Sequence, residues 1–78
     1  MSDTQNKVIE LVAKVAKVDP SEVSPESTFG ESLHTKSIHI LQLIALLNNE
    51  FGITISMPEA RANKSVADVV AMVEAKTA

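Results

Sequence analysis

A serine with basic neighbours is the most chemically suggestive feature of this 78-residue sequence. Ser37 lies in the stretch 33–38 (LHTKSI), with His34 and Lys36 before it and His39 after it. A strongly apolar helical segment follows, so we expect Ser37 to be the N-cap of that helix. A hydroxyl there lies beside backbone N–H groups that have no helical partner. Those N–H groups and the helix dipole both favour a phosphate. The position therefore suits a phosphodiester, and a plain helix cap is the simpler interpretation.

Catalysis by Ser37 is the first alternative, with His34 or His39 as its base. The sequence has no Gly-x-Ser-x-Gly turn and no Gly-rich segment that would form an oxyanion hole. A pair of Lys36 with Ser37 fails because adjacent residues on a helix do not face each other. The two histidines are five positions apart, off a common helix face, with no third metal ligand at the usual spacing. We therefore expect no catalytic residue and no metal, and a protein that is not an enzyme.

Composition excludes further classes of partner. The net charge is -3, and the chain has no basic cluster, Trp or Tyr, which argues against nucleic acid. With no Cys there is no disulfide, thiolate metal site or cysteine nucleophile. No apolar run approaches the roughly 20 residues that span a bilayer, and no signal peptide is evident. We expect a cytoplasmic protein with one domain over residues 1–78 and no membrane span.

Four segments with helical spacing of apolar residues must position Ser37. They cover residues 4–17, 37–51 and 58–63, and a last segment that begins after Ser65. Short connections favour an antiparallel arrangement. The pattern predicts an all-α four-helix bundle, with three longer helices, a short third helix, and a long loop between helices 1 and 2.

The first and last helices each carry one clear apolar stripe. Capping boxes are predicted at Asp19, for a single helical turn, and at Ser65, for the last helix. Ser24-Pro25 also has the pattern of a helix start. The apolar residues that define the two stripes are Val8, Leu11, Val12 and Val15 in the first helix and Val66, Val69, Val70 and Val73 in the last. Those that would hold the loop to the core are Val23, Phe29 and Leu33.

The second helix has more apolar surface than one stripe requires. Ile38, Leu41 and Ala45 have the spacing of a core face, together with the pair Ile44 and Leu47. Further aliphatic residues extend around the helix, at Ile40, Leu43 and Leu46. The helix must therefore bury more than one face, or present one to a partner.

From about Lys7 to Ala75 the sequence resembles the acyl carrier protein family. The matching pieces are Val8-Ile9-Glu10, Ser21-Glu22-Val23, Ser27-Thr28-Phe29, Glu31-Ser32-Leu33, Ser37-Ile38, Leu41, Leu43, Leu47, Glu50, Phe51, Ile55, Ala60 and Ser65-Val66. The resemblance implies that Ser37 receives 4′-phosphopantetheine from a phosphopantetheinyl transferase. The thiol of that arm would carry acyl groups as thioesters between acyl-loading and acyl-using biosynthetic enzymes, and would supply the sulfur that the chain lacks. A mobile shuttle of this kind is expected to be a monomer.

The sequence departs from the family where partners dock. The family's Asp-Ser-Leu triplet is replaced by Lys36-Ser37-Ile38, a Gly by His34, and most acids of helix 2 by neutral side chains. The positions that correspond to the docking surface are Lys36, Ile38, His39, Gln42 and Met57. Electrostatic steering of partners should be weak. The resemblance thus implies a specialised carrier, in fatty-acid-like, polyketide or other biosynthesis, rather than the main fatty-acid carrier.

The resemblance also marks a place for the acyl chain between helix 2 and the short helix. The corresponding lining residues are Phe29, Leu47, Ile55, Ala60 and Asn63, of which Asn63 stands where an aliphatic residue is usual. An ordinary core explains the apolar members equally well. A helical protein-interaction module of the same fold, without a prosthetic group, remains the alternative function.

Overall fold

The structure, a computed structural model, describes residues 3–30, 33 and 36–78, with Ser37 described by its backbone alone. The described residues form four α-helices: α1 (Asp3–Ala16), α2 (Ser37–Phe51), α3 (Met57–Ala62) and α4 (Val66–Thr77). A single 3-10 turn, η1 (Pro20–Glu22), follows α1. No β-strand occurs among them, although one isolated bridge pairs Thr28 with Ser65. The prediction of an all-α fold with a short third helix and a long first loop is confirmed.

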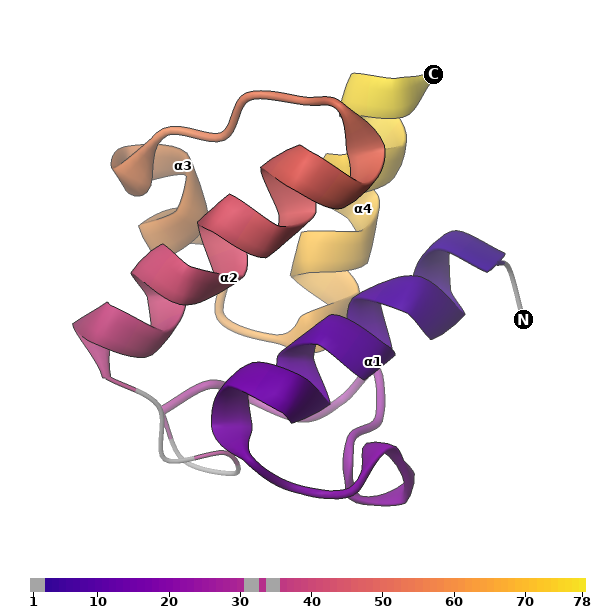
Figure 1. Ribbon diagram of the computed structural model, residues 1–78, viewed down its shortest axis with the longest axis vertical. Helices are drawn as coiled ribbons and strands as arrows, with labels where there is room; N and C mark the ends of the chain where they lie inside the picture. The colour runs from indigo at the N-terminus through magenta and orange to yellow at the C-terminus, as the bar shows by residue number, and fades with distance from the viewer. Residues whose placement is uncertain (1–2, 31–32, 34–35) are drawn as a thin grey trace.

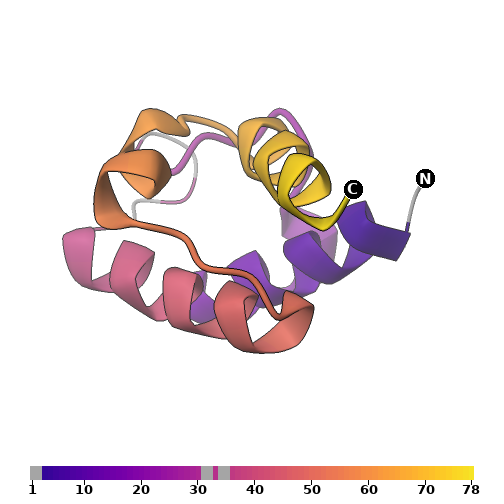
Figure 2. The ribbon, with the colours of Figure 1, turned by 90° about the horizontal axis from the view of Figure 1, so that it is seen from above.

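The helices are arranged so that α1 packs against both α2 and α4 (Figure 1). In that view α1 and α2 run side by side in opposite directions. Figure 2 shows α3 lying over the beginning of α2, with α4 beside α3. None of the described helices is long and apolar enough to cross a membrane.

The core is built from the predicted stripes of α1 and α4. Val8, Val12 and Val15 of α1 are buried, and Leu11 is half-buried against them. In α4 the buried residues are Val66, Val69, Val70 and Val73. The loop contributes the predicted Val23 and Phe29, both buried, with Leu33 half-buried.

The orientation of α2 differs from the prediction. Ile38 and Leu41, expected in the core, are 59% and 55% exposed, and Ala45 is also exposed. The buried residues of α2 are Leu43 and Leu47 instead. Two positions along an α-helix correspond to about 200° of rotation, so Leu41 and Leu43 lie on nearly opposite sides. Because α2 is aliphatic all round, its sequence pattern did not determine which side faces α1.

The loop between α1 and α2 is fastened to the beginning of α4 by its backbone. The N–H of Phe29 donates to Lys64 O at 3.1 Å. In return, the N–H groups of Val66 and Ala67 donate to Ser27 O at 3.0 Å and Pro25 O at 2.9 Å. These bonds use N–H groups that would have no partner at the start of a helix. They fix the part of the loop that precedes the described start of α2.

Local capping rules account for several boundaries. The capping boxes predicted at Asp19 and Ser65 are both present. Ser24-Pro25, however, starts no helix. A tight turn forms instead, closed by Ser27 N–H donating to Ser24 O at 3.0 Å. The chain then extends because the carbonyls of Pro25 and Ser27 accept bonds from α4. An unpredicted capping box at Ser56 starts α3 one residue before Pro58.

Two helices end with a residue in the left-handed region. Lys17 has φ 61° just after α1, and Val18 N–H donates to Ala13 O at 3.0 Å. Gly52 has φ 64° after α2, and its N–H donates to Asn48 O at 2.9 Å. Glycine adopts this geometry freely, whereas a lysine is strained in it.

Candidate functional site

Ser37 is the first residue of α2, and Lys36 is its N-cap, with φ -115° and ψ 177°. The prediction that Ser37 itself is the cap is therefore wrong by one residue. Helical bonding begins at Lys36, because its carbonyl accepts from His39 N at 3.0 Å and from Ile40 N at 3.2 Å. His34 lies outside the described residues.

His39 forms an unpredicted cap at this end of α2. Its Nδ1 accepts a hydrogen bond of 2.8 Å from the backbone N–H of Lys36. An imidazole nitrogen that accepts a hydrogen bond carries no proton, so Nδ1 is the acceptor in this geometry. In a capping box a glutamate or glutamine takes this position and makes the same bond. The histidine thus fixes the backbone conformation immediately before Ser37.

The five residues predicted to dock partners are not all in one place. Lys36, Ile38 and Gln42 are exposed along the beginning of α2, and His39 is half-buried. Met57, at the start of α3, is half-buried and lines the same surface hollow as Lys36. Gln42 instead lines a separate hollow toward α1, beside Lys14 and Leu46. The structure thus brings Lys36 and Met57 together and leaves Gln42 apart.

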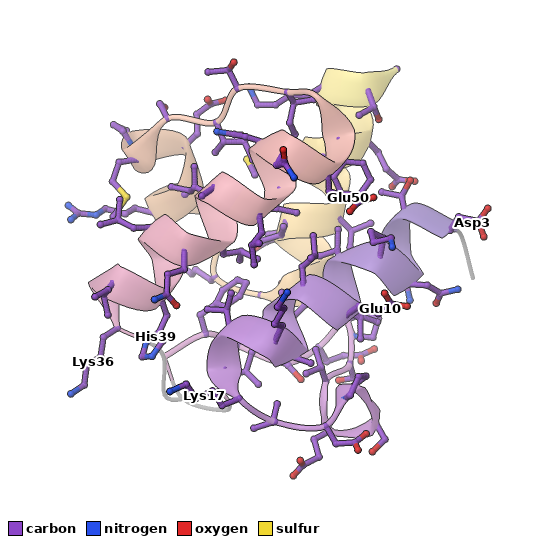
Figure 3. The ribbon with its side chains drawn as sticks, in the orientation of Figure 1. Asp3, Glu10, Lys17, Lys36, His39 and Glu50 are labelled. Carbon is purple, nitrogen blue, oxygen red and sulfur yellow. The ribbon has the colours of Figure 1, made fainter. Side chains whose placement is uncertain are left out.

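Charge is divided unevenly along α2. Figure 3 shows Lys36 and His39 at the beginning of α2, with Lys17 at the same end of the molecule. The only carboxylate of the helix is Glu50, near its other end, and Lys7 of α1 lies 4.0 Å from it. Among the ion pairs between described residues, none involves Lys36. The surroundings of Ser37 in the described part of the chain are therefore cationic or neutral.

A small cavity lies between α2, α3, α4 and the loop. All five residues predicted to line the acyl chain contribute to it: Phe29, Leu47, Ile55, Ala60 and Asn63. The volume is about 10 Å³, at the lower limit for a single water molecule. The cavity is therefore closed in this conformation. The lining residues that the prediction missed are Ile40, Leu43, Ile44, Val69 and Met72.

A larger hollow on the surface leads from the beginning of α2 to this cavity. Its volume is about 450 Å³. Four of its lining residues also line the cavity: Phe29, Ile40, Ala60 and Asn63. Its other lining residues include Lys36 and Arg61. The cavity and the hollow thus share a wall. A group attached next to Lys36 would lie beside the hollow.

Two side-chain contacts join the region of α3 to α4 beside the cavity. Glu59 Oε2 lies 2.9 Å from Lys76 Nζ. The lysine ammonium, helped by the N–H of Ser56, holds the pKa of Glu59 below its usual value. At the end of α3, Asn63 Nδ2 donates to Met72 Sδ at 3.2 Å. Each contact involves side chains that are at least partly accessible to water.

Comparison with known proteins identifies the family. The family model described as the phosphopantetheine attachment site matches residues 6–73. The chain belongs to the acyl carrier protein family. An acyl carrier protein of Thermosynechococcus vestitus is 39% identical over 77 residues, which cover 99% of this chain and 95% of the relative. One from Helicobacter hepaticus is 41% identical over 73 residues, or 94% of this chain and 96% of the relative. A third, from Solidesulfovibrio magneticus, is 33% identical over 70 residues, or 90% of each chain.

Acyl carrier proteins hold 4′-phosphopantetheine covalently, and this is the cofactor of the present chain. The arm supplies a thiol to which acyl groups are joined as thioesters. The beginning of α2 suits the anionic end of such an arm, because its first N–H groups have no helical acceptor and Lys36 adds positive charge. A phosphopantetheinyl transferase attaches the arm to an acyl carrier protein, and biosynthetic enzymes act on the acyl group that the arm holds, so the protein serves as a carrier.

Proposed function

We propose that this acyl carrier protein holds its 4′-phosphopantetheine arm on Ser37. The observation that carries the proposal is the place of Ser37 at the first position of α2, next to the exposed Lys36. Lys36 lines the hollow that shares a wall with the closed cavity. An arm on Ser37 would have its phosphate at the amino end of a helix and its acyl group within reach of the hollow.

The partners are proposed to be those of a specialised pathway, fatty-acid-like, polyketide or other, rather than of the main fatty-acid pathway. The exposed residues of α2 give the reason, since Ile38 and Leu41 are apolar and Gln42 is neutral. Partner enzymes would meet an apolar surface next to a lysine, with little long-range attraction. We propose that the protein works in the cytoplasm as a monomer, which leaves this surface of α2 free for partners.

Intact-mass measurement tests the attachment site. The wild-type protein, co-expressed with a broad-specificity phosphopantetheinyl transferase, should gain the mass of one phosphopantetheinyl group, and Ser37→Ala should gain none. Ser56→Ala is the matched control, because Ser56 is also a serine at a helix start and should load normally. An increment that persists in Ser37→Ala would place the arm elsewhere. A wild-type mass that never changes would favour the helical interaction module without a prosthetic group.

A second comparison tests the specialised role. The same protein is offered to a transferase from a fatty-acid pathway and to the broad-specificity enzyme, and the loading rates are measured at one ionic strength. We expect the first to be much slower than the second. Equal rates would refute the specialised role and leave the assignment of Ser37 intact.

A further inference from the structure

One polar residue stands in the wall of the cavity. Of the described residues that line it, Asn63 alone carries an amide, and the others are aliphatic, aromatic or, in Met72, a thioether. Asn63 also lines the outer hollow, so it lies where the cavity meets the hollow. The residues farther in include Leu43, Leu47 and Val69, all buried. A chain entering from the beginning of α2 would pass an amide first and hydrocarbon afterwards.

The hydrogen bonding of Asn63 is weak and exchangeable. Its backbone is fixed as the C-cap of α3 by its N–H, which donates to Ala60 O at 3.1 Å. Its Nδ2 donates to the sulfur of Met72, and a thioether is a poor acceptor. Within the described residues, no donor reaches Asn63 Oδ1. The side chain therefore has an amide proton and a carbonyl oxygen that a better partner would engage.

An oxygen on the acyl chain would be such a partner. A hydroxyl can accept from Nδ2 and donate to Oδ1, and a keto oxygen can accept from Nδ2. A saturated chain in the same place would remove water from the amide and give nothing in return, which is unfavourable for a polar group. The amide at the mouth thus discriminates between chains of equal length by their oxygen content.

We propose that Asn63 makes this cavity selective for acyl cargo with a hydroxyl or keto oxygen near its thioester end, in preference to fully saturated chains. The proposal rests on the proposed function, because it requires an acyl arm on Ser37. Admission of a chain requires the cavity to expand, and the Asn63–Met72 contact is one of those that must give way.

The test compares two arms of equal length, octanoyl and β-hydroxyoctanoyl, loaded on the full chain from their coenzyme A derivatives and checked by intact mass. Nuclear magnetic resonance contacts between the labelled acyl chain and the side chains of Leu47 and Ile55 report how much of the chain is inside. We expect the ratio of inside to outside to be roughly 2- to 12-fold larger for the hydroxylated chain, the worth of one net hydrogen bond. In Asn63→Leu the preference should reverse, because a buried hydroxyl would then lack a partner.

Two further variants keep the test decisive. Asn49→Leu makes the same chemical change at an exposed position of α2 outside the cavity and should keep the wild-type preference. Met72→Leu removes the sulfur acceptor with little change in volume, and should keep or increase the preference even if Asn63→Leu folds poorly. Equal occupancy by both chains in the wild type would overturn the selectivity. If both acyl chains are loaded and both stay outside the cavity, the role of the cavity is overturned while Ser37 remains the attachment site. If neither chain is loaded, the result counts against the proposed function instead.

Discussion

Removal of the imidazole that caps α2 should weaken the helix on which the arm is proposed to be attached. In His39→Ala the backbone N–H of Lys36 loses the acceptor that now lies 2.8 Å away. Loss of a helix cap costs about 0.5–2 kcal/mol. Because His39 is half-buried, water can replace part of the lost bond, and we expect a value near the lower end, about 0.5–1 kcal/mol. For a domain of this size that corresponds to a fall in Tm of roughly 2–8 °C.

The imidazole also lines a small crevice with Val12 and Val15 of α1, so His39→Ala removes packing together with the hydrogen bond. His39→Glu separates the two effects. A glutamate at this position of the helix makes the same bond to the N-cap N–H, and its charge is favourable at the amino end of a helix. We therefore expect His39→Glu to recover most of the stability that His39→Ala loses, although it lacks the ring.

Thermal unfolding followed by circular dichroism gives Tm, and hydrogen exchange at the Ile40 amide reports the first turn of α2. Asn49→Ala is the control, because it shortens an exposed side chain of the same helix. The transferase loading rate should fall in His39→Ala in step with faster exchange at Ile40. Equal Tm for His39→Ala and Asn49→Ala would refute the capping role. If the Tm of His39→Glu is no higher than that of His39→Ala, the stability lost in His39→Ala is due to packing and not to the hydrogen bond.

Three further predictions concern stability, and urea unfolding measures each. Lys17→Gly should raise the unfolding free energy by about 1 kcal/mol, because a left-handed lysine is strained. Gly52→Ala should lower it by a similar amount, although an added Cβ meets nothing within 4 Å, because Gly52 has the same left-handed backbone. Changes of the same sign in the two variants would contradict the prediction. A lysine ammonium lowers the pKa of Glu59, and backbone N–H groups lower the pKa of Asp68. Both carboxylates therefore stabilise the fold fully above their ordinary pKa values of 4.5 and 3.8, and this stabilisation is lost as the pH falls below those values. The double variant Glu59→Gln with Asp68→Asn should lose less unfolding free energy in acid than the wild type, and an equal loss would count against the prediction. Leu47→Ala, at a side chain only 1% exposed, should cost about 2–5 kcal/mol, and a loss below 1 kcal/mol would mean that the cavity collapses around the gap.

Local rules were sufficient for much of the fold. The spacing of apolar residues located the four helices, and the capping boxes at Asp19 and Ser65 fixed two starts. The direction in which α2 faces could not be predicted in this way. Leu41 and Leu43 are chemically alike, and only the packing of α1 and α3 against one side of the helix distinguishes the exposed leucine from the buried one.

Some residues of the candidate site could likewise be located from the sequence, and others depend on how the helices pack. The family resemblance placed five residues on one cavity, and Ile40, Leu43 and Ile44 were within reach of the prediction because they share a helix face with Leu47. The cap at His39 was missed because histidine is not an ordinary acceptor in a capping box. Arg61 was missed because the hollow that it lines exists only once α3 has folded over the beginning of α2.

The bonds between the loop and α4 also bear on why Ser37, and not Ser65, is proposed to hold the arm. Near Ser65 the first backbone N–H groups of α4 already donate hydrogen bonds. Those of Val66 and Ala67 donate to carbonyls of the loop, and that of Asp68 donates to the Ser65 hydroxyl. The Asp68 carboxylate stands there too, and would repel an incoming anion. Both serines follow a lysine, Lys36 or Lys64, but the third residue of α2 is His39 where α4 has Asp68. The amino end of α4 is therefore less suited to bind a phosphate than the amino end of α2, where the arm is proposed to be attached.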